Sequence, residues 1–190
     1  MPLYNTATDW GWPAKALHWL VAALVVGMLG VGIAMVWLVN DLGSKFQLYQ
    51  LHKSFGVLAF ALVLARLGWR QLNPLVPAIP TNLRPWERMA ALLTHRAFYV
   101  LLLLMPITGW LTASASPLGI PTSVFGLFQL PNPVGPNATL EGVLSFAHAT
   151  LALLLVLLLA LHVGAAWKHH FVLGDDVLAR MLPGHKGRRA

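Results

Sequence analysis

Four long apolar stretches dominate the pattern of hydrophobic and polar positions along the chain. They cover about residues 16–39, 51–69, 89–112 and 143–167. A helix of about 20 apolar residues crosses the hydrocarbon core of a bilayer, so each stretch predicts a membrane-spanning helix. The first stretch is longer than the apolar core of a signal peptide, and no small-residue cleavage site follows it. The pattern predicts an all-α integral membrane four-helix bundle that forms a single domain over residues 1–190.

The polar segments between the stretches differ in character. Residues 73–84 contain three prolines, which prevent a regular helix and predict a stiff connection. Residues 114–137 are rich in Pro, Gly, Asn and Ser and carry no charge, which predicts a turn-rich loop with a short surface helix around Val124 to Phe128. Inside the stretches, Pro106 predicts a kink in the third helix, while Lys53 and Arg66 in the second must snorkel or find a partner.

The composition supports a membrane protein and removes several kinds of site. The chain is 57% hydrophobic and 10% charged, and its mean hydropathy is +0.67. A water-soluble fold of 190 residues could not bury that much apolar surface. Cysteine is absent, so disulfides, an iron–sulfur cluster, a thiolate zinc site and a covalently attached haem are excluded.

The basic residues gather beside one set of helix ends. The net charge is +7, but no basic run is interleaved with exposed aromatics, so no nucleic-acid partner is predicted. With the amino terminus inside, only Lys45 and Lys53 of the 13 Lys and Arg fall outside. The inner set is Lys15, Arg66, Arg70, Arg84, Arg88, Arg96, Lys168, Arg180, Lys186, Arg188 and Arg189. The positive-inside rule therefore predicts that both termini are cytoplasmic.

Four histidines inside the stretches fall into two pairs at matching depth. His18 and His162 lie near the inner face, and His52 and His148 lie near the outer face. The 14 residues from His148 to His162 correspond to about 21 Å of rise and about 40° of rotation, so both rings leave one face of the helix. Bis-imidazole ligation of haem iron uses such a pattern. The spacing predicts two non-covalent haem b groups stacked across the bilayer, with these four histidines as axial ligands.

Other uses of these histidines stay open. A lone membrane histidine is often an interhelical hydrogen-bond partner. A zinc or other transported metal ion is a second use, but no Asp or Glu in the spans completes a coordination shell. A non-redox transporter would use neither haem nor metal. Small residues on the first two helices suit a flat cofactor or close helix packing alike: Gly27, Gly30, Gly32 and Gly56.

Several further side chains have candidate roles. Arg66 follows His52 by 14 residues, which places it near the inner haem as a candidate propionate contact or a snorkelling side chain. Lys53 at the outer face is a candidate for anion steering or for a propionate contact. His95 has no depth-matched partner, so it is a candidate for a quinone contact or a proton relay and not a ligand.

The histidines that follow the fourth stretch lie at the inner interface. His169 and His170 are expected to be solvated there, and His169 is a second candidate for a quinone contact or a proton relay. His185 is expected to be a free tail residue.

The chain resembles the bacterial cytochrome b561 proteins, which are related to the cytochrome b subunits of nickel hydrogenases. The resemblance covers nearly the whole chain and rests on the motifs LHWL, LHKSFG, ARLGWR, THRAFYVLLLLMPITGWL, FAHATLALLL and LHVGAAWKHHF, followed by DDVLARMLP. It implies two b haems bound by the same histidine pairs, in a multi-pass protein of the bacterial inner membrane. It also implies electron transfer from superoxide on the periplasmic side to ubiquinone, the activity of stand-alone superoxide oxidases.

The electron donor is the least defined partner. The loop at residues 114–141 matches no motif of the family, and a donor would dock there. The alternative is a membrane anchor and electron-transfer subunit of a periplasmic dehydrogenase or hydrogenase, and no extension for such a partner is evident. A homo-oligomer in the bilayer is compatible with either.

Overall fold

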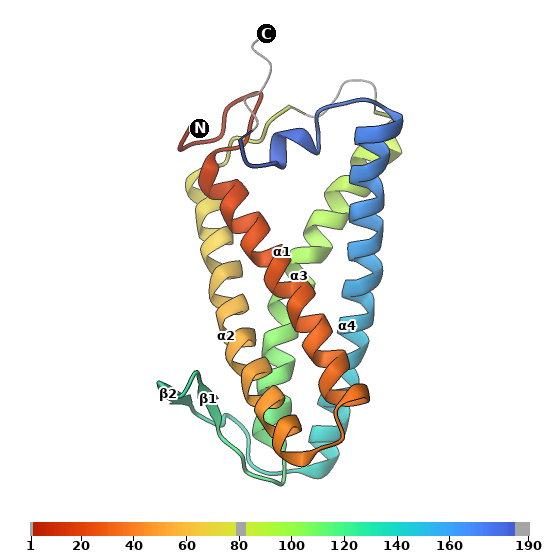
Figure 1. Ribbon diagram of the computed structural model, residues 1–190. Helices are drawn as coiled ribbons and strands as arrows, with labels where there is room; N and C mark the ends of the chain where they lie inside the picture. Colours follow the sequence, from red (N-terminus) through yellow and green to blue (C-terminus); the bar gives the residue numbers. More distant parts are fainter. Residues whose placement is uncertain (1, 79–82, 185–190) are drawn as a thin grey trace.

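The computed structural model describes residues 2–78 and 83–184 and is an antiparallel bundle of long helices (Figure 1). The helices are α1 (Trp12–Ile33), α2 (Leu42–Leu72), α3 (Pro85–Ala115) and α4 (Ala138–Trp167). π-Helical turns extend α1 (Ala34–Leu38) and α4 (Lys168–Val172). With these turns, all four helices are long and apolar enough to cross a membrane. The predicted membrane four-helix bundle is confirmed.

Polar caps, rather than the limits of the apolar stretches, set where the helices begin. The Asp41 side chain accepts a hydrogen bond from the Ser44 backbone N–H at 2.8 Å, so α2 starts well before the apolar stretch expected from residue 51. That hydrogen bond also lowers the pKa of Asp41 and keeps the cap charged. Pro85 occupies the first position of α3, where its missing N–H costs nothing, and Glu87 caps the Arg84 N–H at 3.0 Å.

The loop between α3 and α4 contains a β-hairpin where the sequence predicted a short surface helix. Strand β1 (Thr122–Val124) pairs antiparallel with β2 (Phe128–Leu130). The turn places Phe125 at φ +50° and Gly126 at φ +73°, a left-handed geometry that a helix cannot continue. The Ser54 hydroxyl on α2 accepts from the Phe125 N–H at 3.0 Å, and its one hydrogen is shared between the carbonyls of Gln50 at 2.9 Å and Ser123 at 3.0 Å. The helix prediction was wrong because it could not include this tertiary anchor.

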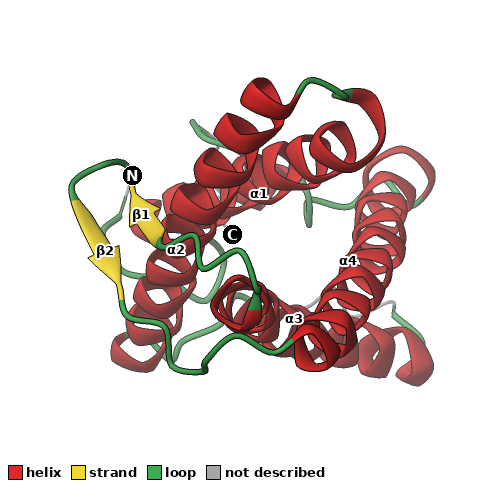
Figure 2. Ribbon diagram, turned by 90° about the horizontal axis from the view of Figure 1, so that it is seen from below, coloured by secondary structure: helices red, strands yellow, loops and turns green. Residues whose placement is uncertain are grey.

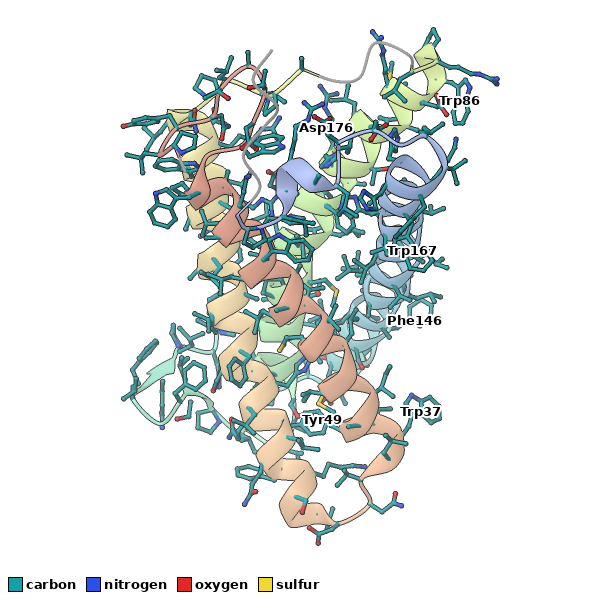
Figure 3. All side chains as sticks on the ribbon, turned by 45° about the horizontal axis from the view of Figure 1, so that its top comes forward. Trp37, Tyr49, Trp86, Phe146, Trp167 and Asp176 are labelled. Atoms are coloured by element: carbon teal, nitrogen blue, oxygen red, sulfur yellow. The ribbon has the colours of Figure 1, made fainter. Side chains whose placement is uncertain are left out.

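Each helix packs on the next along the chain, and the ring of helices does not close tightly. The closest packing joins α1 with α2 and α3 with α4, while α4 hardly approaches the backbone of α1 or α2 (Figure 2). Large side chains such as Trp37, Phe146 and Trp167 point away from the bundle (Figure 3), as expected where the surroundings are lipid. The buried apolar core of the described residues is small: Val21, Met35, Val63, Ala115, Val124 and Leu155.

A polar cap formed by the amino-terminal segment closes one end of the bundle. The Asn5 side chain accepts from the Gly11 N–H at 2.9 Å and donates to the Leu75 carbonyl at 2.7 Å. Lys15, only 3% exposed, forms an ion pair with Asp9 at 2.9 Å. Neutralising the buried ammonium in this way avoids the large cost of an unpaired charge.

The carboxy-terminal segment lies at the same end. The Trp19 indole N–H donates to the Met181 carbonyl at 2.8 Å, and Arg180 donates to the Ala78 carbonyl at 2.8 Å. The first and last described segments of the chain therefore lie on one side of the bundle (Figure 1). The predictions for His185, Lys186, Arg188 and Arg189 lie outside the described residues.

Candidate functional site

The bundle brings the four predicted histidines together as two pairs. His18 on α1 faces His162 on α4, with ring centres 6.2 Å apart. His52 on α2 faces His148 on α4, with ring centres 6.3 Å apart. All four side chains are half-buried. Helix α4 thus supplies one histidine to each pair, and two different helices supply the partners.

These separations fit an iron ion between two opposed imidazoles. Metal–nitrogen bonds of about 2.0 Å and about 1.2 Å from each nitrogen to its ring centre place the two ring centres about 6.4 Å apart. Direct hydrogen bonding between the rings would bring them closer. The backbone of α4 lies apart from the backbones of α1 and α2, and the histidine side chains of each pair reach across this separation. The arrangement suits a flat group held between the two rings of a pair.

The donor set suits haem iron better than a bare metal ion. Among residues 2–78 and 83–184, no group of three or more His, Cys, Asp or Glu side chains is placed to hold a metal ion. Each pair offers two nitrogens, the number that iron in a porphyrin still accepts when both axial positions are filled. The arrangement therefore fits two axial ligands per haem and not a tetrahedral zinc site.

Thr108 on α3 orients His148 of the outer pair. Its hydroxyl lies 3.0 Å from His148 Nδ1 and 2.9 Å from the carbonyls of Leu104 and Met105. Because a hydroxyl has one hydrogen and here donates to a carbonyl, it accepts from the Nδ1–H. This tautomer leaves the lone pair of Nε2 free for a metal ion.

Two glycines border the outer pair. A Cβ on Gly109 would lie 3.1 Å from the His148 ring, and a Cβ on Gly32 would lie 3.7 Å from the His52 ring. His52 Nδ1 is buried without a hydrogen-bond partner. Of the four glycines expected beside the haem planes, Gly32 therefore borders His52, whereas a Cβ on Gly27 or Gly30 would meet nothing within 4 Å and one on Gly56 would meet Met28 at 3.6 Å.

The inner pair has a charged and aromatic surrounding. Arg66 on α2 lies 3.0 Å from His18 Nδ1. On the other side, His95 and Phe98 of α3 lie against His162, with ring centres 5.6 Å and 5.3 Å away. His95 was predicted not to be a ligand because the histidines at its depth are already paired with each other; α3 brings its ring against His162 of that pair. Its Nδ1 donates to the Ala91 carbonyl at 2.7 Å.

Two predicted side chains have partners that the sequence did not indicate. Lys53 donates to the Pro121 carbonyl at 3.0 Å, which ties it to the loop before the hairpin. His169 Nδ1 contacts Asp175, and the His169 side chain is 17% exposed. The expectation that His169 is solvated is therefore wrong, while His170 is exposed.

Sequence analysis missed three residues that border the histidine pairs: Thr108, Gly109 and Phe98. The dipeptide Thr108-Gly109 follows the helix-internal Pro106, and a small polar pair in an apolar helix is the signal that could have pointed to it. Phe98 could not have been recognised from the sequence, because aromatic residues are also common where a membrane helix faces lipid.

Comparison with known proteins identifies the family. Residues 9–184 match the family described as prokaryotic cytochrome b561. The chain belongs to this family. It is 38% identical over 185 residues to cytochrome b561 homolog 2 of Escherichia coli K12, an alignment that covers 96% of this chain and 95% of the relative.

Two further relatives are more distant. Cytochrome b561 homolog 1 of the same organism is 28% identical over 90% of this chain and 94% of its own length. The probable superoxide oxidase CybB of Yersinia pestis is 30% identical over the same shares. Family membership makes this chain a multi-pass bacterial membrane protein of electron transfer, with haem b as the cofactor that the family implies.

Proposed function

We propose that this cytochrome b561 carries electrons across the inner membrane between two haem b groups, from superoxide on the periplasmic side to ubiquinone. The observation that carries the proposal is the presence of two histidine pairs with ring-centre separations of 6.2 Å and 6.3 Å. His18 and His162 would hold the inner haem, and His52 and His148 the outer one. Bound haem would supply a one-electron carrier at each position.

The distribution of basic residues supports this orientation. Lys15, Arg70, Arg180 and other described basic residues belong to the end of the bundle where both termini lie (Figure 1). Only Lys45 and Lys53 belong to the end with the hairpin. The positive-inside rule places the end with both termini in the cytoplasm and the hairpin in the periplasm.

The chain's own residues set the two ends of the electron path. At the outer end, Lys53 keeps two donor hydrogens beyond its bond to Pro121 and can attract a small anion, opposed by Asp41 and Glu141. At the inner end, His95 lies against His162 and His169 pairs with Asp175, which supports a role for these side chains in passing protons to a quinone. Two superoxide ions would each give one electron and leave as oxygen, and one quinone would take both electrons with two protons.

Superoxide is favoured as donor by the resemblance to CybB of Yersinia pestis. The decisive experiment is a redox titration of the detergent-purified protein with haem quantified per chain, followed by stopped-flow reduction with superoxide and reoxidation by ubiquinone. Two b haems per chain, reduced by superoxide and reoxidised by quinone, support the proposal. Superoxide dismutase must abolish the reduction.

Two other outcomes would change the assignment. Two haems that ignore superoxide, together with a catalytic subunit that co-purifies with the tagged protein, would favour the anchor of a periplasmic dehydrogenase or hydrogenase. A protein with fewer than two haems per chain would contradict the paired-histidine assignment itself.

A further inference from the structure

A cavity at the cytoplasmic end, next to the inner histidine pair, is lined by hydrogen-bond donors. Its polar lining includes Arg66, Trp69 and Arg70 of α2 and Asn73 directly after this helix, together with Asn5, His95 and Tyr99. The ring of Tyr4 stacks on Trp69 with ring centres 5.9 Å apart, so the amino-terminal segment covers part of this face. The cavity lies one to two helical turns beyond Arg66 towards the cytoplasm.

Two of these donors are buried without an acceptor. The indole N–H of Trp69 and the side-chain amide N–H₂ of Asn73 have no hydrogen-bond partner, and Asn73 is only 6% exposed. A buried donor without an acceptor is costly. Both residues line the cavity, so an acceptor group placed there would satisfy them.

The charges at the cavity favour an anion. Arg66 and Arg70 both line it, and none of the described lining residues is acidic. Arg70 lies over the Tyr99 ring, 5.8 Å from the ring centre. Arg66 contacts His18 Nδ1 at 3.0 Å, and this ring carries no negative charge. Two guanidinium groups beside a partly buried cavity therefore favour a carboxylate over an uncharged carbonyl.

The contact between Arg66 and His18 supplies a third reason. Arginine only donates, so His18 Nδ1 must accept and the neutral ring carries its proton on Nε2. An Nε2–H cannot bind iron. Ligation by His18 through Nε2 therefore requires Arg66 to leave Nδ1, and a carboxylate in the adjacent cavity gives its guanidinium a stronger acceptor.

We propose that this cavity binds the propionate carboxylate of the haem held by His18 and His162. Arg66 and Arg70 provide the positive charge, and Trp69 and Asn73 each donate one hydrogen bond. The inference rests on the proposed function, because it needs haem at the inner pair. It goes further by assigning Trp69, Arg70 and Asn73 to cofactor binding.

The test combines two conservative variants with a readout on the carboxylate itself. Trp69→Phe keeps the ring and removes only the N–H, and Asn73→Leu removes the amide. The holoprotein is prepared with haem that is isotope-labelled at the propionate carbons, and reduced-minus-oxidised infrared spectra are recorded. We expect the labelled carboxylate band to shift in both variants. The midpoint potential of the inner haem should fall, since a less neutralised carboxylate favours ferric iron, while that of the outer haem stays unchanged.

A variant that adds a negative charge gives an independent test, because it should destabilise a cavity that holds a carboxylate and stabilise one that does not. If a propionate occupies the cavity, Asn73→Asp places a second carboxylate beside it, and loss of the inner haem should accelerate at least tenfold. If the cavity holds no carboxylate, the new Asp pairs with Arg66 or Arg70, and the melting temperature rises without haem loss. Trp167→Phe, on the exposed face of α4, is the matched control and should change none of these readouts.

The outcomes separate this inference from the function on which it rests. A wild-type protein without haem at the inner pair would contradict the proposed function and this inference together. A wild-type protein with two haems, whose labelled band and inner potential do not move in Trp69→Phe and Asn73→Leu, would overturn this inference alone. A band that responds to quinone extraction instead of to haem labelling would assign the cavity to quinone and also overturn it.

Discussion

The two histidine pairs have almost the same separation but different surroundings. At the outer pair, Thr108 accepts from His148 Nδ1 and leaves Nε2 free, so the ring is already in the tautomer that iron needs. At the inner pair, Arg66 donates to His18 Nδ1, and His18 must exchange that contact for another before it can bind iron. Equal ring-centre separations therefore do not give the two histidine pairs the same hydrogen bonding or tautomer.

The difference gives each site its own way to be tuned. The outer pair is oriented by a neutral hydroxyl, which fixes the His148 ring, and is bordered by glycines, which allow a close approach of the backbone. The inner pair lies beside a guanidinium group and a further histidine, which couple it to charge and to protons. Such an asymmetry suits a chain that accepts an electron at one end and delivers it with protons at the other.

The largest effects should come from removing one histidine of each pair. We expect His162→Ala to lose the inner haem and His148→Ala to lose the outer one, each variant keeping one haem per chain, because the pairs share no ligand. Electron transfer from superoxide to quinone should fall to background in both. Pyridine haemochrome quantification with redox titration measures this. Loss of both haems from either variant would break the comparison by showing that the sites assemble only together.

A smaller effect is expected at the hydroxyl that orients the outer pair. Thr108→Val keeps the shape but removes the acceptor for His148 Nδ1, and loss of such an outer-shell partner costs about 10-fold to 100-fold in affinity. Haem dissociation to excess apomyoglobin measures the change, which should be confined to the outer haem. Thr112→Val is the matched control, since the Thr112 hydroxyl donates to the Thr108 carbonyl and contacts no histidine among the described residues. Equal losses in the two variants would argue against a specific role for Thr108.

A modest effect should follow from narrowing the space beside His148. The Cβ of Gly109→Ala would lie 3.1 Å from His148 Cε1 and 3.4 Å from Nδ1, so the ring must move by a few tenths of an ångström. We expect an altered low-spin signal of the outer haem in electron paramagnetic resonance and unchanged inner-haem signals. Gly142→Ala, where a Cβ meets nothing within 4 Å, should be silent. An unchanged spectrum for Gly109→Ala would show that the haem-bound ring lies elsewhere.

The smallest effect concerns the attachment of the hairpin to α2. Ser54→Ala leaves the Phe125 N–H and the Ser123 carbonyl without their shared partner, and an orphaned group of this kind costs about 1–3 kcal/mol. Hydrogen exchange should show faster opening of residues 122–130, with both haems retained. The exposed Ser145→Ala variant on α4, whose side chain has no hydrogen bond in the described part of the chain, should keep wild-type exchange. Haem loss in Ser54→Ala would show that the hairpin also supports the outer site.

Sequence patterns predicted the four helices and the pairing of the histidines, because both depend on local periodicity. Apolar length decides what spans a bilayer, and the rise per residue decides which histidines share a depth. The helix ends were less predictable, since α2 begins at a cap on Asp41 and not where hydropathy rises. The hairpin was predicted as a helix, because its anchor on Ser54 comes from residues about 70 positions away in the chain.

The sequence by itself therefore determined that this chain is a membrane bundle with two histidine pairs at opposite depths. Only the tertiary structure decided what each histidine meets. Helix α3 carries Thr108 to the outer pair and His95 to the inner pair, and α2 carries Arg66 to His18. The physical reason is that hydrogen-bond partners and tautomers depend on the rotation and packing of neighbouring helices, which no local spacing encodes.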